Sequence, residues 1–307
     1  MSRISARRFG VVTVAAVAAL VVSACGSGDE SDQAQPLVFA AVPSEESTSL
    51  EQGYAPIIAM LEQETGREII FQNATDYAAV IEGQRAGKIH FAQYGPFSYV
   101  LAKNSGVETT PIGAFVDEPG GKPGYQSYAI TKSDSPVNSL ADFRGKSVCF
   151  VDPASTSGYL YPSAGLLAEG IDPKNDVNPV MAGGHDASVL AVMSGQCEVG
   201  FAYDTMVDSV LIEKGQLAEG DVKVVWKSEV IPGSPLAISS QLDADLLETI
   251  TKAVHEKGNV DYLMANGFCT DPCDIGEENG WGYTPVDDAL YDGVRKVCET
   301  TKDEKCE

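Results

Sequence analysis

The stretch Asp152-Pro-Ala-Ser-Thr-Ser-Gly158 is the most informative part of this chain. It follows the apolar run Ser147–Val151 and precedes the helix-like run Tyr159–Glu169, a pattern that predicts a strand, a turn and a helix. Unpaired N–H groups at a helix start, together with the three hydroxyls of this turn, offer hydrogen-bond donors and the positive end of a helix dipole. We therefore predict an oxyanion-binding turn. Local sequence alone leaves an alternative, because Ser and Thr also commonly cap helices.

Similar units of short apolar runs and longer helical runs fill the rest of the folded part, which we expect to begin near Leu37. This alternation predicts an α/β fold, and roughly 270 residues are enough for two domains. Five elements are expected before the turn at Tyr94: Leu37–Val42, Glu68–Phe71 and Ile89–Gln93 as strands, and Tyr54–Thr65 and Tyr77–Ala86 as helices.

Two extended apolar segments, Tyr125–Lys132 and Val230–Ser239, are flanked by Pro, Gly or Ser. A chain that leaves one domain and returns to it needs two such crossings, so we expect these segments to be hinges. The predicted boundaries are 37–130 plus 232–307 for a discontinuous first lobe and 131–231 for a second lobe.

The first residues predict an export signal. Arg3, Arg7 and Arg8 precede a run from Phe9 to Val22 that is too short for a stable transmembrane helix. Val22-Ser23-Ala24-Cys25 resembles the lipobox of bacterial lipoproteins, which implies cleavage after residue 24 and lipidation of Cys25. An ordinary secretory signal with an accidental cysteine is the alternative, and the paired arginines leave the Sec and twin-arginine export routes both open.

The segment that follows, residues 25–36, is rich in Gly, Ser, Asp, Glu and Gln, which predicts a flexible tether. No later stretch is apolar for the eighteen or so residues of a membrane span, so we expect the lipid alone to hold the body at the extracytoplasmic face of the cell membrane.

The chain has a formal charge of −23, and removal of residues 1–24 takes away three arginines and no acid. Such an acidic protein is a poor partner for nucleic acid.

Seven cysteines are present, and reserving Cys25 for lipid leaves six. An even number outside the cytosol predicts disulfides. Position in the chain favours Cys149 with Cys197, and pairing of the other four among themselves. A four-cysteine metal site is the alternative, although no histidine stands beside these residues, and we expect no metal and no cofactor. The remaining four candidates are Cys269, Cys273, Cys298 and Cys306.

Five motifs follow one another along the chain: Ala41-Val-Pro43, Tyr94-Gly-Pro-Phe-Ser-Tyr99, the 152–158 turn, Gly183-Gly-His-Asp-Ala-Ser188 and Tyr203-Asp204. As an ordered set they resemble the substrate-binding proteins of phosphonate and phosphite ABC importers, over nearly the whole chain from Leu37 to about Val297. The resemblance implies the bilobed periplasmic-binding-protein fold (type II), with two α/β lobes joined by two hinge strands, and a monomer that delivers its ligand to an ABC permease.

The resemblance also implies a set of residues around a small phosphorus oxyanion. Asp204 is unusual in this set because a carboxylate repels an anion unless a P–OH proton lies between them, and a helix cap is its alternative role. Glu45, Asp76 and Asp186 are weaker acidic candidates, while Tyr54, Tyr159 and Tyr203 are expected to pack. The implied ligand-binding residues are Tyr94, Ser155, Thr156, Ser157, His185 and Asp204.

Two other functions are alternatives to an importer binding protein. Ser157, His185 and Asp204 include the residue types of a hydrolase triad, but no G-x-S-x-G elbow is present and no histidine follows the acid, so we expect no enzyme. A binding protein that signals to a membrane sensor would share the same fold and site. Phosphite, phosphate, methylphosphonate and 2-aminoethylphosphonate differ by one substituent on phosphorus, and the compact His185 motif favours a small ion such as phosphite.

Overall fold

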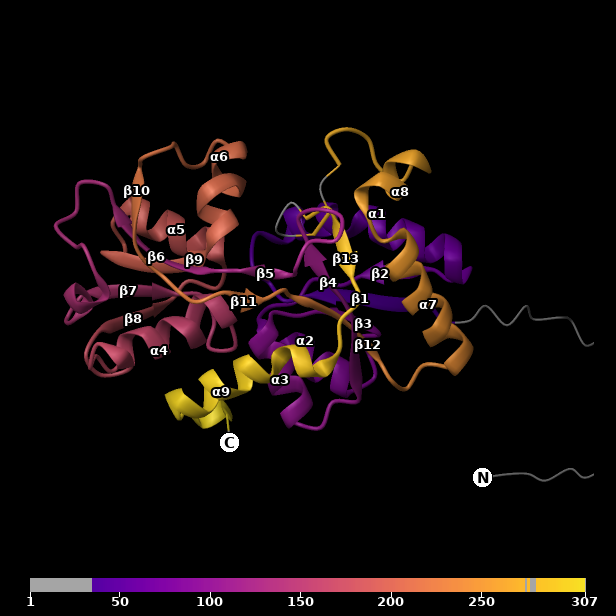
Figure 1. The fold of residues 1–307 in the computed structure, drawn as a ribbon, viewed down its shortest axis with the longest axis horizontal. Helices are drawn as coiled ribbons and strands as arrows, with labels where there is room; N and C mark the ends of the chain where they lie inside the picture. The colour runs from indigo at the N-terminus through magenta and orange to yellow at the C-terminus, as the bar shows by residue number, and fades with distance from the viewer. Residues whose placement is uncertain (1–34, 274, 277–279, 307) are drawn as a thin grey trace, which may run out of the picture. The chain divides into compact units, whose positions relative to one another are not determined.

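Two mixed β-sheets organise the chain in this computed structural model, which describes residues 35–273, 275–276 and 280–306 (Figure 1). The first sheet has the strand order β2-β1-β3-β12-β4-β13. β1, β2 and β3 run parallel, whereas β12 is antiparallel to both of its neighbours. Its strands are β1 Leu37–Ala41, β2 Ile69–Phe71, β3 Phe91–Gln93, β4 Thr109–Val116, β12 Pro235–Ser239 and β13 Gly282–Thr284.

The second sheet repeats this topology with the order β8-β7-β9-β6-β10. β7, β8 and β9 run parallel, and β6 is antiparallel to β9 and β10. All of its strands come from the segment between the two crossings of the chain. They are β6 Ser127–Lys132, β7 Ser147–Phe150, β8 Asn178–Met181, β9 Val199–Tyr203 and β10 Val222–Lys227.

Helices cover both faces of each sheet, so successive strand residues are buried on opposite sides. In β1, Leu37 and Phe39 pack with α1, α7 and α8, while Ala40 packs with α2 and α3. In β7, Val148 packs on the α4 side and Cys149 on the α5 side. The helices are α1 Ser47–Thr65, α2 Tyr77–Arg85, α3 Pro96–Asn104, α4 Tyr161–Ala168, α5 His185–Ser194, α6 Leu211–Glu213, α7 Ala244–Lys257, α8 Val260–Ala265 and α9 Asp292–Thr301.

The crossings between the two sheets are shorter than the sequence predicts. β5 Gly124–Tyr125 and β11 Ile231–Pro232 form an antiparallel pair of their own, and these few residues link the sheets. Most of the predicted hinge segments lies inside β6 and β12, where both neighbours supply ladder hydrogen bonds. A Cβ on Gly124 would lie 2.8 Å from Val230 Cγ1, so glycine allows the two crossing chains to approach.

All six cysteines outside the signal region form disulfides, as the sequence predicts. Cys149 pairs with Cys197, Cys269 with Cys273 and Cys298 with Cys306. The four-cysteine metal alternative is therefore wrong, because every one of those sulfur atoms is already bonded to another sulfur.

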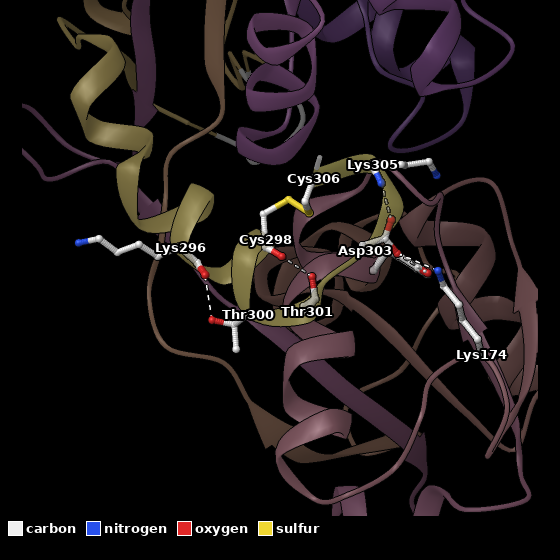
Figure 2. Close-up of a disulfide and its surroundings, with 9 residues drawn as sticks. Lys174, Lys296, Cys298, Thr300, Thr301, Asp303, Lys305 and Cys306 are labelled. Carbon is white, nitrogen blue, oxygen red and sulfur yellow. Dashed lines mark hydrogen bonds and ion pairs between the residues drawn. A yellow bond between two sulfur atoms is a disulfide. The ribbon is translucent and has the colours of Figure 1, made fainter.

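The C-terminal disulfide folds the end of the chain back onto α9 (Figure 2). Asp303, only 9% exposed, lies just before Cys306, and its carboxylate accepts hydrogen bonds from the Tyr159 hydroxyl at 3.3 Å and from Lys305 N at 3.1 Å. The Lys174 ammonium lies 3.2 Å from the same carboxylate (Figure 2). Residues after α9 are thus attached to the second sheet's domain, although they belong in sequence to the segment after the return crossing.

The predicted signal, the lipidation site Cys25 and most of the predicted tether lie outside the described residues. Within the described ranges, no helix combines the length and the apolar composition that a membrane crossing requires.

Candidate ligand-binding site

A small cavity lies where the carboxyl ends of strands from both sheets meet. Ligands of open α/β sheets bind in this place because the loops after parallel strands leave helix starts and free loop groups at one edge. Its volume is about 20 Å³, little more than one water molecule requires. It is lined by Val42, Ser44, Tyr77, Gly95, Tyr125, Ser155, Thr156, Ser157, His185, Tyr203 and Ser234.

The predicted oxyanion-binding turn, Asp152–Gly158 or the serine loop from here on, forms one wall of this cavity. Ser155 caps a π-helical turn, Thr156–Leu160, that continues into α4, and its hydroxyl accepts a hydrogen bond from Gly158 N at 3.1 Å. Asp152 holds the loop from the other side by accepting from Ala154 N at 2.7 Å. The serine loop thus caps a helical turn and lines the cavity at the same time. The two interpretations of its sequence, helix capping and oxyanion binding, are therefore compatible.

Glycine is required where the serine loop turns back on its own strand. A Cβ on Gly158 would lie 2.4 Å from Val151 Cβ and 2.8 Å from Ser155 Oγ. Contacts this short do not occur for real Cβ atoms, so any larger residue would displace the loop. The absence of a side chain lets Val151 N donate to Gly158 O at 3.1 Å, which closes the loop.

Thr156 connects the serine loop to the first sheet's domain. Its hydroxyl accepts a hydrogen bond from Phe97 N at 2.8 Å, one of the N–H groups that the first turn of α3 leaves without a helical partner. Gly95, the residue before α3, makes room for this contact, since a Cβ there would lie 3.2 Å from Thr156 Oγ1. The positive end of α3 therefore faces the same cavity as the start of the π-helical turn.

His185 is the first residue of α5 and is only 3% exposed. Tyr203 N donates to its Nδ1 at 3.1 Å, so Nδ1 has to be unprotonated and the neutral ring carries its proton on Nε2. Burial lowers the pKa of His185 to about 3, so the ring is neutral at physiological pH. Nε2 lies 3.4 Å from Ser155 Oγ and can donate one hydrogen bond to an anion without adding a charge.

This geometry does not form a hydrolase triad. In a triad the histidine donates from Nδ1 to a carboxylate, whereas Nδ1 of His185 accepts from a backbone N–H. The carboxylate of Asp204 is bound elsewhere. The cavity therefore has hydroxyl and imidazole donors but not the proton-transfer chain of a serine hydrolase.

Two of the predicted ligand-binding residues are not on the cavity wall. Tyr94 is fully buried and its hydroxyl donates to Gln84 Oε1 at 3.0 Å, on the α2 side of the first sheet. Asp204 accepts from Gln126 N at 2.9 Å and from Thr205 N at 3.1 Å, so its carboxylate attaches the end of β9 to the start of β6. The structure brings together the serine loop and His185 but not these two side chains.

The weaker acidic candidates also have other partners. Asp76 caps α2 by accepting from Ala79 N at 2.8 Å. Glu45 forms an ion pair with Lys214, and Asp186 accepts from Glu46 N at 3.1 Å. In the described part of the chain, the cavity lining therefore includes neither a carboxylate nor an ammonium or guanidinium group.

Sequence reasoning missed several wall residues. Tyr77 begins α2 directly after the cap Asp76, and Tyr125 lies in the crossing strand β5. Ser44 and Ser234 line the cavity as well, and Tyr203, expected only to pack, lies 4.6 Å from the ring of His185 between ring centres. A usable signal existed for Ser44, Tyr77 and Tyr203, since each lies at or near the point where a parallel strand leads into a helix.

A protein-family model for the periplasmic substrate-binding proteins of phosphonate ABC transporters matches residues 39–259. The phosphate-import protein PhnD of Mycolicibacterium smegmatis is 45% identical over 311 residues, covering 96% of this chain and 97% of that protein.

Solved structures show the same fold. The binding protein of a phosphonate ABC transporter from Pseudomonas aeruginosa superposes with a TM-score of 0.75 at 25% identity, covering 88% of this chain and 87% of that one. The PhnD1 protein of Prochlorococcus marinus, solved with methylphosphonate, has a TM-score of 0.71 at 15% identity, covering 87% and 98%. The predicted bilobed α/β fold is confirmed, and the two sheets are the cores of its first and second lobes.

Proposed function

This chain belongs to the family of periplasmic substrate-binding proteins of phosphonate ABC transporters, and from that premise we propose that it captures a small phosphorus oxyanion in the cavity between the serine loop and α3. Its family makes it the extracytoplasmic binding component of an importer and not an enzyme. The observation that supports this site is that several uncharged hydrogen-bond donors lie around the same cavity. Two helix starts, the serine-loop hydroxyls and Nε2 of His185 lie around one small cavity.

Neutral donors suit a protein that has to release its ligand. Hydrogen bonds to an anion are stronger than those between neutral groups, and helix dipoles add to them without a buried countercharge. Hydroxyl groups also accept hydrogen bonds, so the Ser157 hydroxyl can accept a hydrogen bond from the P–OH group of a protonated ligand. This role replaces the one predicted for Asp204, whose carboxylate is held by Gln126 N and Thr205 N.

Size and charge favour the smallest ligands of the class. The cavity volume of about 20 Å³ leaves little room for a substituent on phosphorus. No carboxylate lines the described wall to pair with the ammonium of an aminoalkylphosphonate. We therefore propose phosphate or phosphite as the ligand, with methylphosphonate weaker and 2-aminoethylphosphonate weakest. The name of the relative from M. smegmatis, a phosphate-import protein, supports this order.

Capture proceeds by closure of the lobes in this proposal. The short crossings β5 and β11 bend, and the ligand stabilises the closed state that an ABC permease recognises. The first lobe is then 37–126 plus 232–301 and the second is 127–231, because all of β6 belongs to the second sheet, and residues 302–306 attach to the second lobe. A lipid on Cys25 attaches the monomeric protein to the membrane, and residues 25–36 act as its tether.

Isothermal titration of ligand-free protein tests the proposed function. Phosphate, phosphite, methylphosphonate, 2-aminoethylphosphonate and sulfate are compared under one buffer condition. We expect one-to-one binding of phosphate or phosphite, with weaker binding in the order given above. Failure of every phosphorus compound to bind, or binding of sulfate alone, would contradict the proposal.

A pair of serine variants locates the site in the same experiment. Ser157→Ala removes a hydroxyl from the cavity wall, and we expect about a tenfold loss of affinity. Ser163→Ala removes a buried hydroxyl of α4 that does not line the cavity. Equal affinities of the two variants would place the ligand elsewhere.

A further inference from the structure

Three successive residues of the loop after β1 in the first lobe contact the second lobe, and two of them do so at the start of α5. Ser44 O accepts from His185 N at 2.6 Å, and Glu46 N donates to Asp186 Oδ2 at 3.1 Å. Between them, the carboxylate of Glu45 is paired with the ammonium of Lys214, which follows α6 in the second lobe. We call residues 44–46, His185, Asp186 and Lys214 the interlobe contact.

Lys214 provides the positive charge of this contact. The charged groups that face Glu45 among the described residues are Lys214, Asp186 and Glu46, so one ammonium opposes a group of three carboxylates. The Glu45 side chain is 4% exposed, and a carboxylate so deeply buried depends on a cation and hydrogen bonds for its solvation. Lys214 Nζ also donates to Ser49 Oγ at 3.1 Å, in the first turn of α1. Separation of the lobes would break both of these bonds.

The interlobe contact is adjacent to the proposed ligand site but outside it. His185 belongs to both, since its backbone N–H bonds to Ser44 O while its ring lines the cavity. Neither Glu45 nor Lys214 lines the cavity. A change at Lys214 can therefore alter the stability of the closed form without removing a ligand contact.

We propose that Lys214 is a positioning residue that sets ligand affinity by holding the loop at Ser44–Glu46 against the start of α5 in the closed form. This inference rests on the proposed function, because it treats lobe closure as the binding step. Observed affinity is the intrinsic affinity reduced by the fraction of protein in the competent state, so a less stable closed form binds more weakly. The loss falls mainly on the dissociation rate, because the closed lobes hold the ligand.

The first test measures closure without ligand. The folded unit Gln35–Glu307 contains both lobes and the interlobe contact. Small-angle X-ray scattering of this unit is compared for the wild type, Lys214→Met, Lys214→Arg and Lys146→Met. Lys146 pairs with the more exposed Glu198 at 2.9 Å entirely within the second lobe, so its variant removes an ion pair that has no role in closure. We expect a larger radius of gyration for Lys214→Met alone. Identical radii for all four proteins would overturn the proposal.

The second test measures ligand kinetics by stopped flow, with inorganic phosphate and phosphite as the probes. Lys214→Met is expected to raise the dissociation rate about fivefold to tenfold, with little change in the association rate. Lys214→Arg should restore most of the wild-type rate, and Glu45→Gln should weaken binding in a manner not additive with Lys214→Met. Equal losses in Lys214→Met and Lys146→Met would overturn the proposal.

The two tests separate failure of this inference from failure of the proposed function. If neither probe binds the wild type, the proposed ligand is wrong, while the scattering comparison still decides whether Lys214 holds the lobes together. If the wild type binds a probe and Lys214→Met binds it equally well, the ligand assignment stands and the role of Lys214 is wrong.

Discussion

The strand ends of the two lobes face the same cavity but bring different chemistry to it. The second lobe contributes side chains, namely the serine-loop hydroxyls and the imidazole of His185. The first lobe contributes Val42, Ser44, Tyr77 and Gly95 to the wall, while its backbone groups Phe97 N and Ser44 O bond to the second lobe. Both lobes have the same strand topology, so topology places the loops while the loop sequences determine their roles.

This difference suggests that the two lobes have different roles. We expect substitutions in the second lobe to remove ligand contacts, and substitutions in the first lobe to affect lobe closure. Disulfide placement follows the same division, because Cys149 lies just before the serine loop and Cys197 lies just after α5. The disulfide thus joins the two elements of the second lobe that carry the proposed ligand contacts.

The largest expected effect is on stability, from removal of that disulfide. Cys149→Ala/Cys197→Ala opens a loop with a sequence separation of 48, which we expect to lower the free energy of unfolding by about 4 kcal/mol. Cys269→Ala/Cys273→Ala, in the first lobe, has a separation of only 4 and should cost about 2 kcal/mol. Chemical denaturation of both variants measures the difference. Equal losses would show that loop length does not govern the stabilisation.

The next effect is on affinity, from the ring of His185. His185→Asn keeps an acceptor for Tyr203 N where Nδ1 lies, but it loses the Nε2 donor. We expect about a 100-fold loss of affinity with a small change in stability. His185→Ala should lose stability as well, since Tyr203 N is then left buried without a partner. Titration calorimetry and thermal unfolding of both variants check this. Wild-type affinity in His185→Asn would remove Nε2 from the site.

Acid should destabilise the second lobe through the same residue. The pKa of His185 is lowered by burial to about 3, below the ordinary value of 6.5, so between these values the unfolded chain binds a proton that the folded chain does not. The free energy of unfolding therefore falls as the pH falls below 6.5, by about 2 kcal/mol on reaching pH 5. Denaturation at several pH values measures this change.

A first-lobe histidine provides the comparison for the pH experiment. Burial also lowers the pKa of His90, whose Nδ1 accepts from Val38 N at 2.9 Å, but this side chain is less buried than His185. Carboxylates also change the free energy of unfolding as the pH falls. The difference between the wild type and His185→Asn in this pH dependence gives the contribution of His185 alone. His90→Asn should reduce the pH dependence less. If His90→Asn reduced the pH dependence of unfolding more than His185→Asn did, His90 and not His185 would be its main source.

The smallest expected effects come from two glycine variants, one of which should affect lobe closure and the other folding. Gly95→Ala places a Cβ 3.2 Å from Thr156 Oγ1 of the other lobe, which should lower affinity about fivefold with an unchanged melting temperature. Gly158→Ala places a Cβ 2.4 Å from Val151 Cβ within one lobe, and it should lower the free energy of unfolding by about 1–3 kcal/mol. A stability loss in Gly95→Ala would show that Gly95 supports its own lobe and not closure.

Much of the fold was predictable because it depends on local patterns. The strand–turn–helix unit around the serine loop, the strand that begins at Leu37 and the start of α2 at Tyr77 agree with the sequence prediction. Apolar spacing and caps determine such elements directly. Helix α1 begins at Ser47, seven residues before the predicted start at Tyr54. The sequence pattern missed these first turns because they are polar and half-exposed and show no apolar period.

The sequence by itself determined the α/β class, the Cys149–Cys197 disulfide, the family and the serine loop with His185 as candidate ligand contacts, but not how the other four cysteines pair. These depend on residue types in order along the chain. Only the tertiary structure decided that Tyr94 donates to Gln84, that Asp204 binds Gln126 N, and that Lys214 joins Glu45 across the lobes. The physical reason is that a side chain's direction depends on strand phase and on partners distant in sequence, and no local pattern encodes these.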